Sequence, residues 1–173
     1  MSNSRRGLRF STPLTETCPR GLRFWIRAWL PVAVCVALVA LESTATFGAD
    51  RTTHPLRWLV QLFFGHLRDN TWNFVHLCIR KSGHFLGYGV LGLAWLRAWR
   101  MSLQGSRFLV DFLFALAGTA LVASCDEWHQ TFLPNRTGSP WDVLLDCSGA
   151  LVTQLVVYVF MRLFRPGMLV PRN

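Results

Sequence analysis

The chain has 173 residues, of which 51% are hydrophobic and only 16% are charged. This charged fraction is well below the roughly 25% of soluble domains, and the apolar content excludes a largely disordered chain. Eighteen basic against nine acidic residues give a formal net charge of +9. Such a basic balance in so apolar a chain is typical of a membrane protein with arginines in its loops. It disfavours nucleic-acid binding, which needs a basic stripe with stacking aromatics.

Residues 1–22 are polar and basic, with few large apolar side chains. We predict that this segment is a mostly disordered cytoplasmic tail. The membrane domain is expected over residues 23–165, followed by a short C-terminal tail at 166–173.

Four long apolar stretches follow the basic segment, at about residues 24–47, 82–99, 108–125 and 141–164. A membrane-spanning helix needs about 20 residues, and each stretch approaches this length only by including a charge near one end. The alternative of a soluble helical bundle is disfavoured because runs such as WLPVAVCVALVAL are apolar on all sides. The sequence therefore predicts an all-α, integral membrane bundle with four transmembrane helices.

The distribution of arginines predicts the orientation in the membrane. With a cytoplasmic N-terminus, twelve of the 18 cations fall on the cytoplasmic side and six on the outer side. The positive-inside rule then places both termini in the cytoplasm of a cell (inner) membrane protein. The long outer loop over residues 50–80 contains WLVQLFFGHL and WNFVHLCI, which are too short to span. We expect these to form short interfacial or re-entrant helices.

Polar residues open the second apolar stretch. Lys81, His84 and Tyr88 are spaced i, i+3 and i+7, which places them on one helical face. Small residues at Gly83, Gly87 and Gly92 allow another helix to approach closely. The plainer alternative is that the lysine extends to the interface and the glycines only pack.

The third stretch ends in acidic and amide side chains. Asp126 and Gln130 share a helical face at i, i+4, with Glu127 beside them. A turn containing Pro134, Asn135 and Gly138 follows.

The fourth stretch begins with helix-start signals and two acids. Ser139 suits an N-cap and Pro140 the first helical position, so Asp142 either caps the helix or belongs to a site. Asp146 lies one turn deeper on the face of Asp142, Gly149 and Thr153, where a carboxylate needs a partner.

Two motifs, K-S-G-H-F-L-G-Y and D-E-W-H-Q-T-F-L-P-N-R-T-G-S-P-W-D-V-L-L-D-C-S-G, resemble the signature of the VanZ-like membrane proteins, over about residues 28–162. The sequence Glu42-Ser43-Thr44 also resembles a family feature. The resemblance implies a compact helical membrane domain with a polar site. It also implies a link to low-level resistance against lipid-bearing glycopeptide antibiotics such as teicoplanin, with no settled reaction. The matching positions are Glu42, Lys81, His84, Tyr88, Asp126, Glu127, Gln130, Arg136, Asp142 and Asp146.

Two positions depart from the family pattern: Asn135 stands where glycine is expected, and Asp146 where many members have asparagine. The charges of the matching residues also constrain the site. Lys81 and Arg136 supply two positive charges against five carboxylates, so a shared apolar pocket would carry net −3. Such an excess requires protonated carboxyls, contact with water, or a divalent cation, for which oxygen ligands suit Mg²⁺ or Ca²⁺.

Several functions fit this pattern. The first is a protein that binds membrane lipids, a lipid-linked envelope intermediate or an amphiphilic antibiotic at the outer leaflet, with Lys81 and Arg136 holding an anionic headgroup. The second is an integral-membrane enzyme acting on a phosphorylated or acylated lipid, with His84, Asp126 and Glu127 as candidate catalytic residues. The third is a transporter or a structural assembly factor. A transporter is disfavoured because four segments are few and no internal repeat is visible. A homodimer could form through the Gly83-xxx-Gly87 face.

Overall fold

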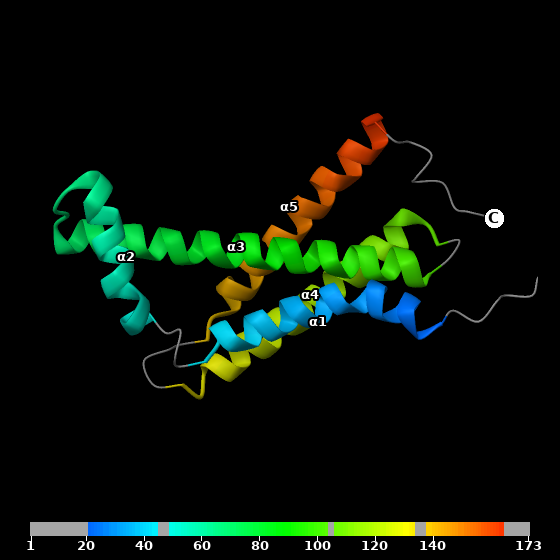
Figure 1. Ribbon diagram of the computed structural model, residues 1–173, viewed down its shortest axis with the longest axis horizontal. Helices are drawn as coiled ribbons and strands as arrows, with labels where there is room; N and C mark the ends of the chain where they lie inside the picture. Colours follow the sequence, from blue (N-terminus) through cyan, green and yellow to red (C-terminus); the bar gives the residue numbers. More distant parts are fainter. Residues whose placement is uncertain (1–20, 45–48, 104–105, 134–137, 165–173) are drawn as a thin grey trace, which may run out of the picture.

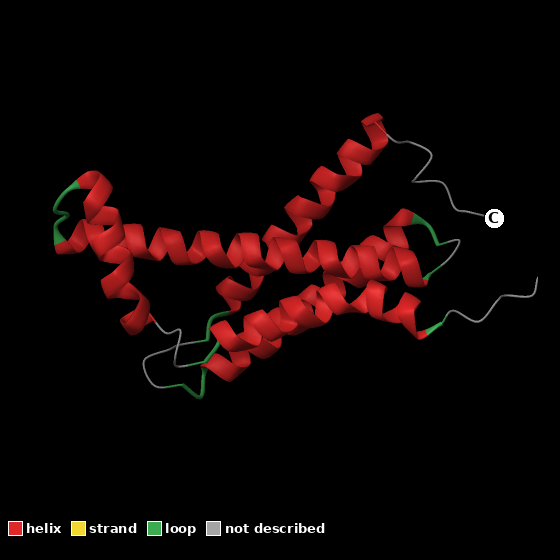
Figure 2. Cartoon of the chain, in the orientation of Figure 1, coloured by secondary structure: helices red, strands yellow, loops and turns green. Residues whose placement is uncertain are grey.

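The computed structural model describes residues 21–44, 49–103, 106–133 and 138–164. Within these ranges the chain forms five helices and no strand (Figure 2), so the expected all-α class is confirmed. The helices are α1 (Leu22–Glu42), α2 (Ala49–Phe64), α3 (Asp69–Ser102), α4 (Phe108–Gln130) and α5 (Pro140–Phe164). The two expected tails lie almost entirely outside the described residues.

Three of these helices, α1, α4 and α5, are long and apolar enough to cross a membrane. Among the described residues, α3 does not meet the same criterion of length, hydropathy and charge. Its apolar part includes His84, Arg97 and several glycines, which lower its mean hydropathy. The expected count of four spans is therefore not confirmed.

Two short helices were predicted in the outer loop over residues 50–80, and only the first of them forms. The first part of this loop forms a separate short helix, α2, which ends where Gly65 adopts a φ of 74° and donates its N–H to the Gln61 carbonyl at 2.9 Å. The expectation of a second short helix over residues 72–79 is wrong, because these residues belong to the 34-residue α3. No proline interrupts α3, and Gly83 and Gly87 do not end it.

Helix α3 is the centre of the bundle and packs against α1, α4 and α5 (Figure 1). It crosses α5 in close contact, because a Cβ on Gly149 would lie 2.1 Å from the Phe85 carbonyl oxygen. A Cβ on Gly92 would lie 2.7 Å from that of Ala150, which agrees with the close approach expected at Gly92. At Gly83 and Gly87 no helix of the same chain approaches as closely, since an added Cβ would meet no atom within 4 Å, and the predicted homodimer contact through this face stays a prediction.

Candidate functional site

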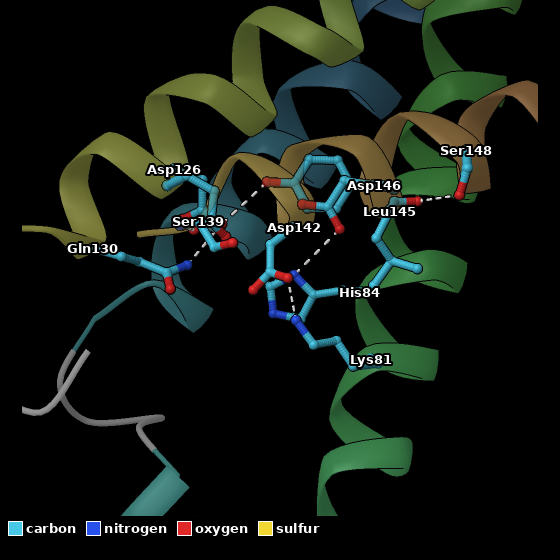
Figure 3. A network of polar contacts seen from close by, with 11 residues as sticks. Lys81, His84, Asp126, Gln130, Ser139, Asp142, Leu145, Asp146 and Ser148 are labelled. Atoms are coloured by element: carbon cyan, nitrogen blue, oxygen red, sulfur yellow. Dashed lines mark hydrogen bonds and ion pairs between the residues drawn. The ribbon is translucent and has the colours of Figure 1, made fainter. Parts of the chain in front are cut away.

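Side chains of α3 contact acids of α4 and α5. Figure 3 shows Lys81 and His84 of α3 beside Asp142 and Asp146 of α5. The contacts are Lys81–Asp142, His84–Asp146 and Tyr88–Asp126. The α3 residues follow one another at about one helical turn, as their spacing predicts. Each pair therefore occupies its own level along the face that α3 shares with α4 and α5.

The Lys81–Asp142 ion pair is the most accessible of the three. The side chains are 39% and 29% exposed. Asp142 lies in the first turn of α5, where the Ser139 hydroxyl accepts the Trp141 N–H at 3.3 Å. Ser139 therefore caps the helix start, and the Asp142 carboxylate binds the lysine.

The second pair contains a fully buried acid. Asp146 has no exposed surface, and its Oδ1 lies 3.4 Å from Nδ1 of His84. Neither carboxylate oxygen of Asp146 has a hydrogen-bond partner among the described residues. The imidazole is partly accessible at 28% exposure, so it separates the buried carboxylate from the outside.

Asp126 accepts two hydrogen bonds on one oxygen. Its Oδ2 receives the Tyr88 hydroxyl and Nε2 of Gln130, both at 3.1 Å. The bond from Gln130 confirms the shared face expected at i, i+4. The rings of His84 and Tyr88 stack at 6.2 Å between centroids, which joins the second and third levels of the site.

Glu127 of α4 contacts the residue just before the start of α5. Its Oε2 accepts the Ser139 N–H at 2.8 Å. A Cβ on Gly138 would lie 2.3 Å from the Glu127 carbonyl oxygen, so only glycine fits this close approach. One oxygen of this carboxylate therefore binds the start of α5, whereas the other, Oε1, is buried with no hydrogen-bond partner among the described residues.

A small cavity lies between α1, α3 and α4 beside the site. Its volume is about 20 Å³, and its polar walls include Glu42, Ser43, His84, Asp126 and Gln130. A cavity of about 10–15 Å³ already holds one water, so this one has room for little more. Gly83 and Gly87 line it as well, which accounts for the open space at these glycines.

A larger groove opens on the other side of α3, against α5. Its volume is about 330 Å³, and it is lined by Lys81, Ser82, Phe85, Leu86 and Leu145. Sequence reasoning missed this groove, since its leucines and phenylalanine look like any lipid-facing residues.

The predicted site residues have different outcomes. Glu42 borders the small cavity and is not part of the three α3 contacts. Arg136 lies outside the described residues. In the described part of the chain, no three His, Cys, Asp or Glu side chains are arranged to hold a metal ion.

One further contact was missed although its residues are in the motifs. The Ser43 hydroxyl lies 3.1 Å from Nδ1 of His129, which joins the C-terminal ends of α1 and α4. The signal was present, because both residues belong to segments that carry the resemblance.

The comparisons identify the chain's family. No curated protein and no solved structure matches the chain. The family model described as VanZ/LLP1 matches residues 27–162, a range that includes every residue of the three contacts. Since this match covers most of the sequence, the chain is a membrane protein that belongs to the VanZ/LLP1 family.

Proposed function

We propose that this protein binds an anionic lipid-linked envelope intermediate, or an amphiphilic antibiotic, at the outer face of the cell membrane. The observation that carries the proposal is the half-exposed Lys81–Asp142 pair at the edge of a buried polar network. Ionisable groups inside membrane segments are costly and usually belong to a functional site. Here three acids of α4 and α5 are brought to one face of α3.

We assign Lys81 as the residue that binds the anionic headgroup of the ligand. A phosphate or carboxylate with more than one acceptor oxygen competes with Asp142 for this ammonium. Arg136 is assigned as a second cation on the grounds of its motif. The excess of arginines at the opposite end of the bundle supports an outward-facing site, through the positive-inside rule. This placement also gives the site access to envelope intermediates and to antibiotics.

A binding measurement with purified protein tests the proposal. The full chain in micelles is titrated with polyprenyl phosphate and, separately, with teicoplanin. Replacing Lys81→Gln removes a partly exposed ion pair with the headgroup and is expected to weaken binding by about two- to fivefold, since such pairs contribute up to about 1 kcal/mol. Lys81→Arg keeps the charge and should retain most of the affinity.

The matched control is Arg68→Gln, which removes one cation from the exposed N-cap of the same helix. Its affinity should stay close to that of the wild type. Equal weakening by both glutamine variants would mean that the ligand senses only the overall charge, and the assignment of Lys81 would be wrong.

An enzyme remains the second candidate because of the His84–Asp146 pair. Asp146 Oδ1 lies within ion-pair distance of His84 Nδ1, at 3.4 Å. If this contact tightens to a hydrogen bond when a lipid binds, the carboxylate orients the ring and the other nitrogen acts as a general base. The test is turnover of phosphorylated and acylated lipids with and without Mg²⁺. Loss of turnover in His84→Ala with retained lipid binding favours the enzyme. Absence of turnover in the wild type favours the binding protein.

A further inference from the structure

The two hollows beside the site differ in what they can hold. The polar cavity between α1, α3 and α4 is about 20 Å³, which suits a water and excludes a phosphate-bearing headgroup. The groove between α3 and α5 is an open depression of about 330 Å³, so it can hold part of a ligand along its floor without enclosing it as a ligand pocket does. A ligand of Lys81 therefore has room on the α5 side of α3.

The groove follows from how α3 and α5 cross. The helices touch through backbone where Gly149 meets Phe85. Toward the start of α5, the space between them is bounded by apolar side chains of Phe85, Leu86 and Leu145. Leu86 is 61% exposed, so the groove is open sideways to the surrounding lipid. Lys81 lies at its polar end, where its ammonium meets Asp142.

We propose that this groove holds one acyl chain of an anionic membrane lipid, whose phosphate replaces Asp142 at Lys81. The inference rests on the proposed function and deepens it by giving the hydrocarbon part of the ligand a binding place. An apolar groove with a cation at one end is complementary to a lipid that has an anionic head and an apolar tail. In the structure Asp142 occupies the position that we propose for the headgroup, and because its carboxylate is 29% exposed, water can hydrate it when the phosphate replaces it.

Photo-crosslinking in the lipid bilayer tests the location of the chain directly. The full chain is placed in nanodiscs of phosphatidylcholine that contain a trace of phosphatidic acid with a diazirine in one acyl chain. The same diazirine lipid with a choline headgroup is the reference. Labelled residues are mapped by mass spectrometry. We expect the anionic probe to label the segments around Phe85 and Leu145 about two- to fivefold more than the choline probe, the range of a partly exposed ion pair.

Two matched pairs of variants separate the groove from the charge. Leu145→Trp fills the groove and should remove the excess labelling, whereas Leu144→Trp, at a neighbouring residue that is 59% exposed and outside the groove, should not. Lys81→Gln should also remove the excess, whereas Arg68→Gln should not. Because the wild-type labelling pattern is itself a readout, the test does not depend on every variant folding.

The outcomes test the acyl-chain groove separately from the proposed binding of an anionic ligand at Lys81. If the anionic probe binds in a Lys81-dependent way but labels residues outside the groove, the proposed function stands and the groove assignment is overturned. If both probes label the groove equally, or if Leu144→Trp and Leu145→Trp act alike, the groove is ordinary lipid-facing surface. If Lys81→Gln changes neither labelling nor headgroup binding, both proposals are overturned.

Discussion

Asp126 accepts both of its hydrogen bonds on a single oxygen while it is only 8% exposed. Its second oxygen has no partner in the described part of the chain. Buried carboxylates are stabilised mainly through the donors that reach them, so the Tyr88 and Gln130 bonds hold this acid in place. Tyr88 thus contributes to the site by holding Asp126 in place. Removal of the Tyr88 hydroxyl tests this role directly.

Tyr88→Phe removes that donor and keeps the ring. We expect a loss of about 0.6 kcal/mol, and at most about 1.7 kcal/mol, the range measured for hydrogen bonds between membrane helices. The readout is the midpoint of unfolding by sodium dodecyl sulfate in mixed micelles. The chain's only other tyrosine, Tyr158, is 36% exposed and packs on Phe108, so Tyr158→Phe serves as the control with little change. Equal losses in the two variants would contradict a role for the Tyr88–Asp126 bond.

Asp146 differs from Asp126 because it is completely buried and neither of its oxygens accepts a hydrogen bond from a described residue. Removing one partner of a buried ion pair is destabilising when it leaves the other charge buried and unpaired. Here the partner is His84, which is 28% exposed and can release its proton, so the substitution removes a costly buried charge without leaving another unpaired. We expect Asp146→Asn, which keeps the shape, to unfold within about 1 kcal/mol of the wild type or above it. The same micelle titration measures this. A clear loss of stability would show that the charge itself is needed beside His84.

The sequence predicted which residues form the α3 side of the site but not which acid each would meet. The spacing of Lys81, His84 and Tyr88 is a local property of a helix, so their common face could be read directly. The pairing with Asp142, Asp146 and Asp126 depends on how deeply α5 and α4 pack against α3. That depth is set by contacts between residues far apart in the chain.

At the scale of the elements, the crossing of α3 and α5 determines the site. Small residues let the two backbones approach, and Thr153 donates a hydrogen bond to the Gly89 carbonyl at 3.1 Å across the contact. A Cβ on Gly89 would lie 2.8 Å from the Thr153 side chain. The register between α3 and α5, and with it the three contacts of the site, is fixed by this close packing.

Gly149→Ala tests the crossing, because its methyl group would lie 2.1 Å from the Phe85 carbonyl oxygen. The helices would have to separate, and we expect a loss of about 1–3 kcal/mol, as in overpacked cores. Gly87→Ala is the matched control on α3, since an added Cβ meets nothing within 4 Å there. It should be neutral or stabilising by up to about 1 kcal/mol, from helix propensity. Detergent unfolding of both variants decides the matter. A similar loss in both would mean that helix approach is not the cause.

The start of α5 and the length of α3 show which features of the helices can be predicted from the sequence. The start of α5 at Pro140 was predictable from local N-cap chemistry at Ser139. The continuity of α3 through residues 72–79 was not, because its mixed polar and apolar residues resemble those of an interfacial helix. Only the absence of a proline in α3 could have indicated one long helix.

At the scale of the whole molecule, contacts at the helix ends determine the direction of each helix. The Ser43–His129 contact joins the C-terminal ends of α1 and α4, so these helices run parallel. The Trp29 indole donates to the Ser102 hydroxyl at 3.1 Å, which joins the start of α1 to the end of α3. Both helices are apolar enough to cross a membrane, and parallel helices that cross it require the chain to return between them. Among the described helices, α3 is placed to make that return, although its composition alone does not select it.

Cysteine labelling in intact cells tests this topology. The chain has five cysteines, and Cys78 lies exposed in the N-terminal half of α3. In a variant that keeps Cys78 alone, we expect a membrane-impermeant maleimide to label it from outside. A cysteine placed at Leu103, just past the end of α3, should react only after lysis, since the positive-inside rule places that end in the cytoplasm. The reverse labelling pattern would mean that the protein is inserted in the opposite orientation, with the site at the cytoplasmic face. Labelling of both positions from outside would mean that α3 does not cross, so that the parallel arrangement of α1 and α4 would need a different return through the membrane.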